Sequence, residues 1–123
     1  MRYNDYNSSG ILQDAFHVYR RNNLVRSQTA FSHRILGRKP SYYSCMVTRG
    51  RKPSLRVLET LQMVTKTIMA TFLGNPHFGK SYAENLNQAY EELQQLVERI
   101  GVELSFLQAV DQLADQMDDL GVS

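Results

Sequence analysis

The chain has 123 residues, enough for one compact domain with a short additional element but too few for the scaffold of a typical enzyme, so we expect no enzymatic activity. No apolar run approaches the roughly 20 residues of a membrane span, and the first residues lack the apolar core of a secretory signal, which predicts a soluble, cytoplasmic protein. The single Cys45 excludes an internal disulfide and the histidines are scattered, so we expect no metal and no cofactor.

The charge changes sign along the chain. Residues 1–80 hold 13 of the 14 basic residues and only three acidic ones, a balance of +10. Residues 81–123 hold one basic residue and nine acidic ones, a balance of −8. A block of positive charge attracts polyanions, which would repel the acidic block. We therefore expect the first part of the chain to face nucleic acid.

Capping residues and apolar spacing predict the first two helices. Ser9 can cap a helix that ends at Asn22 and Asn23 in a left-handed turn. The apolar side of this helix is formed by Ile11, Leu12, Ala15, Phe16 and Tyr19. Ser27 can cap a second, short helix over residues 28–36, after which Gly37 is free to adopt the left-handed conformation.

Pro40 suits the first position of a third helix, because the N–H that it lacks would be unpaired there in any case. The spacing then places Tyr43, Met46 and Val47 together on one side of this helix. The opposite side carries Ser41, Tyr42, Ser44 and Cys45.

A basic turn over residues 49–53 follows, and Ser54 can cap a fourth helix that extends to Phe72. No segment shows the two-residue alternation of a strand, which predicts an all-α fold. A glycine and proline cluster at residues 74–79 coincides with the change in charge sign. We therefore divide the chain into a first domain over residues 1–75, a linker over 76–80 and an acidic helical segment over 81–123.

The acidic segment has a coiled-coil-like apolar stripe. Its members recur at heptad spacing and are Leu86, Tyr90, Leu93, Val97, Ile100, Leu104, Leu107 and Ala114. Gly101 interrupts the stripe at a cost of about 1 kcal/mol relative to alanine, so the segment is either one helix or two helices folded back. Asp111 stands where the next apolar residue is due. The stripe can pair with a second molecule or pack back on the first domain.

From Ser27 to Ser54 the chain resembles the helix-turn-helix of the lambda-repressor-like, Xre-type DNA-binding domains. Those domains have a second helix, a glycine turn, a recognition helix, a basic turn and a Pro-Ser start to the next helix. The matching stretches here are Ser27-Gln28, Leu36-Gly37 and Arg51-Lys52-Pro53-Ser54. At the level of helix order the resemblance covers residues 11–72. It implies a four- to five-helix lambda-repressor-like domain, here followed by a C-terminal helical extension.

The resemblance also implies which residues contact DNA. A recognition helix over about residues 40–48 would enter the major groove, which an α-helix fits. Its base-contact candidates are Ser41, Tyr42, Ser44 and Cys45. The phosphate-contact candidates are Gln28, Arg38, Lys39, Arg49, Arg51 and Lys52. This chain departs from the family pattern at Pro40 and Tyr42, where small or amide residues are usual, and its turn glycine, Gly50, comes one position late.

We therefore expect a sequence-specific double-stranded DNA-binding transcriptional regulator from a bacterial, plasmid or phage context. It would act as a homodimer, because one small helix-turn-helix makes few contacts. The dimerisation candidates are Leu86, Tyr90, Leu93, Val97, Ile100, Leu104 and Leu107. The alternative is a protein-interaction or antitoxin-like accessory factor that binds a partner protein through residues 81–123. RNA binding ranks below both.

Overall fold

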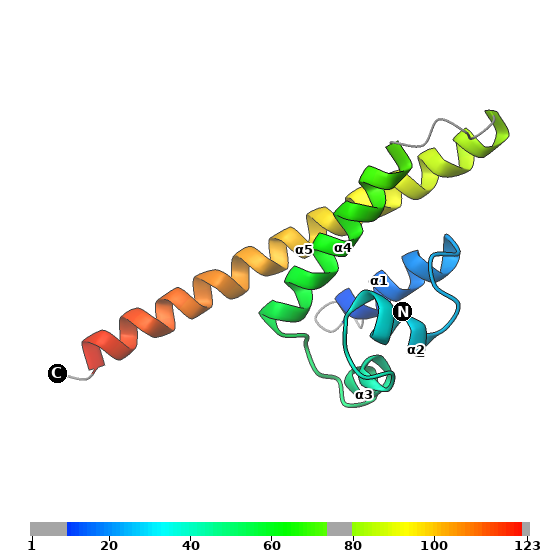
Figure 1. The fold of residues 1–123 in the computed structure, drawn as a ribbon. Coiled ribbons are helices and arrows are strands. Elements are labelled where there is room, and N and C mark those ends of the chain that lie inside the picture. Colours follow the sequence, from blue (N-terminus) through cyan, green and yellow to red (C-terminus); the bar gives the residue numbers. More distant parts are fainter. Residues whose placement is uncertain (1–9, 74–79, 122–123) are drawn as a thin grey trace, which may run out of the picture.

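The structure is a computed structural model that describes the backbone of residues 10–73 and 80–121 and the side chains of residues 10–71 and 88–114. These residues form helices and no strand, which confirms the predicted all-α class (Figure 1). The elements are α1 (Gly10–Arg21), α2 (Gln28–Ala30), the π-helical turn η2 (Phe31–Ile35), α3 (Tyr42–Thr48), α4 (Leu55–Leu73) and α5 (Lys80–Gly121). The predicted cap Ser9 and the linker cluster at 74–79 lie outside the described residues.

Helix α1 buries its apolar side as the sequence predicts. Ile11, Leu12, Ala15, Phe16 and Tyr19 are all buried. The helix ends where Asn23 takes a left-handed φ of 60°, and the N–H of residue 24 donates to the carbonyl of residue 19 at 2.8 Å. This six-to-one bond and the accompanying bond from residue 23 to residue 20 form a Schellman motif, so the predicted helix end is confirmed.

The second helix begins as predicted but is not a uniform α-helix. The Ser27 hydroxyl accepts a hydrogen bond from the N–H of Ala30 at 3.1 Å, which confirms the cap. From Phe31 the chain continues as one π-helical turn, closed by a bond from the N–H of Leu36 to the carbonyl of Phe31 at 3.1 Å. Both of these side chains are buried, because the five-residue step keeps them on the same face. Gly37 then takes the expected left-handed conformation, with a φ of 66°.

Helix α3 begins two residues later than predicted, at Tyr42 rather than Pro40. The N–H of Tyr42 donates to the carbonyl of Lys39 at 2.9 Å, and Ser41 has φ −86° and ψ 0°. These values are those of the third residue of a type I β-turn, whose second position is Pro40. The fixed φ of proline therefore favours this turn, which leads into the helix. The same φ also suits the first position of a helix, so rules for helix starts do not distinguish the two roles of Pro40.

The turn between α3 and α4 explains why its glycine, Gly50, comes one position later than in the family pattern that the sequence resembles. Gly50 has a φ of 60°, and the N–H of Arg51 donates to the carbonyl of Met46 at 3.0 Å. Gly50 is thus the left-handed residue of a Schellman motif that ends α3. Ser54 caps α4 as predicted, since its hydroxyl accepts from the N–H of Val57 at 3.3 Å.

Helix α5 is one continuous helix of 42 residues, so the alternative of two helices folded back is wrong. Gly101 lies inside it, at the crossing with α4. A Cβ atom on Gly101 would lie 3.5 Å from Nε2 of Gln62, and this amide donates to the carbonyl of Val97 at 3.5 Å. Packing against α4 therefore supports the helix at the point where the glycine weakens it.

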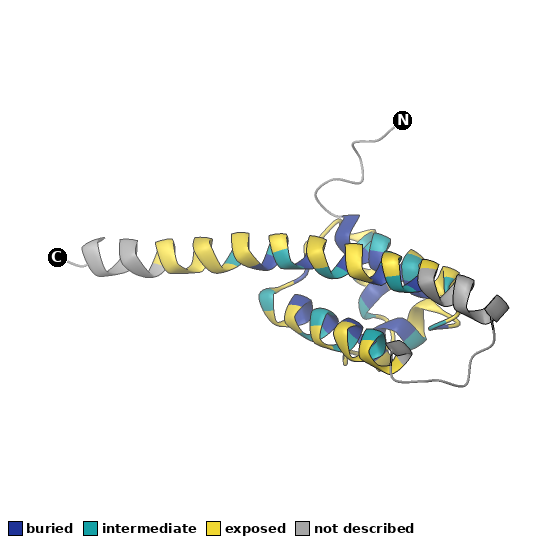
Figure 2. Ribbon diagram, turned by 90° about the horizontal axis from the view of Figure 1, so that it is seen from above, coloured by how far each residue is buried: buried dark blue, intermediate teal, exposed yellow. Residues whose placement is uncertain are grey.

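Helices α4 and α1 both pack on α5, and one hydrophobic core joins all three. The α5 residues in this core are Leu93, Leu96, Ile100 and Leu104, which lie with residues of α1, η2, α3 and α4. At the α1 face, Arg21 pairs with Glu92 at 2.5 Å and Arg99 pairs with Asp14. Figure 2 shows the exposed part of α5 extending beyond the other helices. No helix in the described part of the chain is long and apolar enough to span a membrane.

Candidate nucleic-acid interface

Helix α3 has the two sides that its spacing predicts. Tyr43 is buried and Met46 and Val47 are half-buried, so this side faces the core. The other side presents the four base-contact candidates: Ser41, Ser44 and Cys45 are exposed, and Tyr42 is half-buried. In Figure 1, α3 lies on the side of α1 and α2 that is turned away from α5. The outer face of α3 is thus available to a large ligand.

A buried hydrogen bond fixes the first turn of α3 to the second helix. The N–H of Tyr43 donates to Oγ of Ser32 at 2.9 Å, and both residues are buried. An N–H in the first turn of a helix has no partner within that helix, so the Ser32 hydroxyl supplies the missing acceptor. Sequence reasoning missed Ser32. The available signal was a hydroxyl residue beside Phe31 and Ile35 on the apolar side of the second helix.

Aromatic packing supports the same junction. The ring of Tyr43 lies 4.9 Å from that of Phe16 and 5.6 Å from that of Phe31, measured between centroids. The contact with Phe31 is edge-on, a favourable geometry for aromatic pairs. Burial, and to a smaller extent the charge of the Asp14 carboxylate, raises the pKa of Tyr43 to about 12. The phenol is therefore neutral at ordinary pH. The ring contacts with Phe16 and Phe31 anchor α3 to α1 and to the second helix.

Tyr42 is held by its neighbour in the preceding turn. The guanidinium carbon of Arg38 lies 5.9 Å from the centre of the Tyr42 ring, within reach of a cation–π contact. Burial raises the pKa of Tyr42, and the positive charge of Arg38 acts in the opposite direction. The hydroxyl of Tyr42 therefore stays protonated at neutral pH and can donate or accept a hydrogen bond.

The phosphate-contact candidates lie on both flanks of α3. Arg38 and Lys39 lie in the turn before it, Arg49 directly follows it, and all three are exposed. The remaining candidates, Gln28, Arg51 and Lys52, are exposed as well. Residues 15–58 contain ten basic residues and no acidic residue. The stretch of chain that carries the outer face of α3 is therefore rich in basic residues and free of acidic ones.

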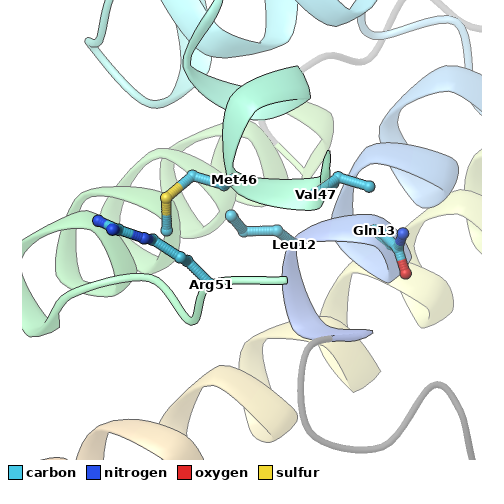
Figure 3. A pocket seen from close by; sticks show the side chains of 5 residues that line it. All are labelled: Leu12, Gln13, Met46, Val47 and Arg51. Carbon is cyan, nitrogen blue, oxygen red and sulfur yellow. The ribbon is translucent and has the colours of Figure 1, made fainter. Parts of the chain in front are cut away.

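Arg51 lies at the edge of a small hollow beneath the end of α3 (Figure 3). The hollow is lined by Leu12, Gln13, Met46, Val47 and Arg51, which come from α1, α3 and the turn after α3. In Figure 3 the guanidinium of Arg51 lies beyond Met46, away from Gln13. Arg51 therefore lines the hollow and is also exposed, as a long side chain can be when its stem packs and its charged end stays in solvent.

Two further arginines, Arg26 and Arg34, belong to the same basic stretch and were not predicted as phosphate contacts. A surface groove at the start of the second helix is lined by residues 23–27, Ala30 and Arg34, and it includes Arg26. Both arginines are exposed and lie close in sequence to the predicted phosphate contact Gln28. The sequence did offer a signal for them: Arg26 lies directly before the cap of the second helix, and Arg34 lies within that helix.

The predicted dimerisation stripe has a different place. Leu93, Ile100 and Leu104 are buried in the core of their own chain, and Leu107 packs against it. Tyr90 and Val97 are half-buried, and the side chain of Leu86 lies outside the described residues. The described part of the stripe packs on α4 and α1, which offer it an apolar surface. Leu93, Ile100 and Leu104 cannot contact a second molecule in this conformation.

No group of three histidine, cysteine, aspartate or glutamate side chains gathers into a metal site within residues 10–71 and 88–114.

A comparison with protein families matched residues 12–113 to a family of unknown function, DUF6626. The chain belongs to DUF6626. No curated protein and no solved structure matched the sequence. The DUF6626 match runs from α1 far into α5, so the family unit includes both the small helices and the long one.

Proposed function

We propose that this DUF6626 protein is a sequence-specific double-stranded DNA-binding transcriptional regulator. It acts as a dimer and places α3 of each subunit in the major groove. One observation carries the proposal: the exposed polar face of α3 is bordered by basic turns on both sides, within a stretch that contains no acidic residue. This is the arrangement in which phosphate contacts orient a helix whose outer side chains read bases.

The side chains suit these roles. The Ser44 hydroxyl donates to the carbonyl of Ser41 at 3.1 Å, which leaves its lone pairs free to accept from a base. Tyr42 offers an aromatic face for the methyl group of thymine and a hydroxyl for a base edge or a phosphate. Arg38 and Lys39 can contact the backbone at one end of α3, and Arg49 can do so at the other.

The test is binding of the purified full chain to random and genomic DNA fragments across a salt series. We expect a few fragments to stay bound at salt concentrations that release random DNA. Absence of binding even at low salt would remove the DNA-binding proposal.

Arg51→Ala should weaken binding to all sequences alike and reduce the slope of log K against log salt by about 0.9, the value for one phosphate contact. The control is Lys66→Ala, which removes the same charge from an exposed position on α4. We expect the control to leave the slope unchanged. Equal slopes for the two variants would exclude Arg51 from the interface.

The exposed apolar side chains on the projecting part of α5 favour a second candidate function. In it, the protein is an antitoxin-like or other accessory factor whose acidic helix binds a partner protein. This candidate predicts a monomer that does not bind DNA. The salt series together with the mass in solution therefore separates the two.

A further inference from the structure

Helix α5 has two apolar faces, and only the first of them packs on the core. The first, through Leu93 and Ile100, faces the core. The second consists of Val102, Phe106, Val110 and Leu113, and we call these four residues the outer stripe. They are 71%, 63%, 45% and 57% exposed. Val102 follows Leu93 by nine residues, which is two and a half helical turns, so it points away from the core.

The outer stripe is continuous and lies where the helix leaves the rest of the fold. Its members are spaced by four, four and three residues, which keeps them on one side of an α-helix. Among the described side chains, Leu107 is the last of α5 that packs against the core, and the helix continues to Gly121, about 21 Å further at 1.5 Å per residue. Scattered exposed apolar residues are common, but a row of four on a projecting helix indicates an interaction site.

We propose that the outer stripe binds the outer stripe of a second copy of this chain, as an antiparallel helix pair. Reversing the stripe about position 108 exchanges Phe106 with Val110 and brings Val102 to within one residue of Leu113. The stripe is therefore complementary to itself under a two-fold rotation, as an interface between identical subunits requires.

The charges favour this partner and this direction. From Leu104 to Val110 the helix carries no charged residue, so two acidic helices can approach there without repulsion. Antiparallel pairing sets Asp111 opposite Ser105 of the second copy. A parallel pair would set every acidic residue beside its own copy, which is unfavourable.

This inference names the contact for the dimer assumed in the proposed function. Its test uses no DNA, so failure of the dimer and failure of DNA binding are distinguishable. Light scattering during size-exclusion chromatography should give twice the mass of the chain. Phe106→Glu should raise the dissociation constant about 30-fold or more, as expected for loss of a central anchor. Circular dichroism should show an unchanged fold, because Phe106 is exposed.

The matched control is Gln108→Glu, which adds the same charge at an exposed position outside the outer stripe. It should remain dimeric. The outer stripe would be excluded as the interface if the wild-type chain were monomeric or if the Phe106→Glu variant stayed dimeric. Equal dissociation of the Phe106→Glu and Gln108→Glu variants would exclude it as well.

Cysteine cross-linking tests the direction in a Cys45→Ser background. In an antiparallel pair, Val102→Cys combined with Leu113→Cys should give a disulfide-linked dimer under mild oxidation, whereas each single variant should not. Two copies of position 113 would be about 15 Å apart along the helices, beyond the reach of a disulfide. Cross-linking by Leu113→Cys alone would show a parallel pair and overturn the antiparallel arrangement.

Discussion

At the scale of single residues, the hydroxyl of Ser32 decides how α3 is presented. It accepts from the buried N–H of Tyr43, and no other acceptor for this group lies among the described hydrogen bonds. The side chain therefore links the second and third helices, which must keep a fixed angle for α3 to meet a ligand. A serine on a helix is often a solvent-exposed residue, so its sequence alone does not reveal this contact.

Ser32→Ala should lower the free energy of unfolding by about 1–3 kcal/mol, because a buried N–H loses its acceptor. Urea denaturation measures the change. The control is Ser44→Ala, which removes the same hydroxyl from an exposed position on α3 and should cost less than about 0.5 kcal/mol. Equal losses would contradict the role of Ser32.

At the scale of elements, local signals predicted most ends of the helices, although they placed the start of α3 two residues early, and they failed where packing decides. Ser27, Gly37 and Ser54 were correct because a cap or a left-handed residue acts on adjacent backbone. The π-helical turn at Phe31 was not predicted, because it depends on which side chains the core accepts. The choice between one long helix and two at Gly101 also required the surface of α4.

The same limit applies to the candidate site. The two sides of α3 follow from its period, so the exposed face at Ser41 and Ser44 was predictable. The sequence showed that the heptad stripe of α5 is apolar but not which surface it packs on. Leu93 and Ile100 would have the same spacing whether they packed on their own chain or on a second one. The outer stripe was missed because it begins only where the heptad stripe weakens.

The contact between α1 and α5 should make stability depend on acidity. The carboxylate of Glu92 accepts from Arg21 and from the amide of Asn22, and the Arg21 bond is the main cause that lowers the pKa of Glu92 below 4.5. A lowered pKa in the folded state means that this stabilisation is present above the ordinary value and is lost as pH falls through the folded value.

Glu92→Gln should therefore flatten the fall in melting temperature as pH is lowered below about 4.5. The control is Glu91→Gln at the adjacent exposed position. It should keep the wild-type dependence. Parallel curves for all three proteins would assign the acid sensitivity to other carboxylates.

At the scale of the whole molecule, the first helices and α5 form one structural unit despite their opposite charges. The core contains Leu93, Leu96, Ile100 and Leu104 together with residues of α1, η2, α3 and α4. A chain ending at residue 75 would lose these side chains, and each fully buried one contributes about 1.5–3 kcal/mol. That sum is comparable with the total stability of a small domain.

We therefore expect residues 1–75 alone to be unfolded by circular dichroism, whereas residues 1–114 should melt cooperatively near the full-length temperature. Among the described side chains of α5, the longer piece keeps all those that pack in the core. A cooperatively folded 1–75 fragment would contradict the shared core.

The separation of the two faces of α5 has a consequence for gene dosage. A chain that completes its core with its own α5 can fold before it meets a second copy. A subunit therefore needs no partner to be stably folded. While dimers are scarce, their number rises with the square of the subunit concentration. Under the proposed function, a twofold change in expression would then change the occupancy of an operator up to fourfold, which gives a steep response without any small-molecule signal.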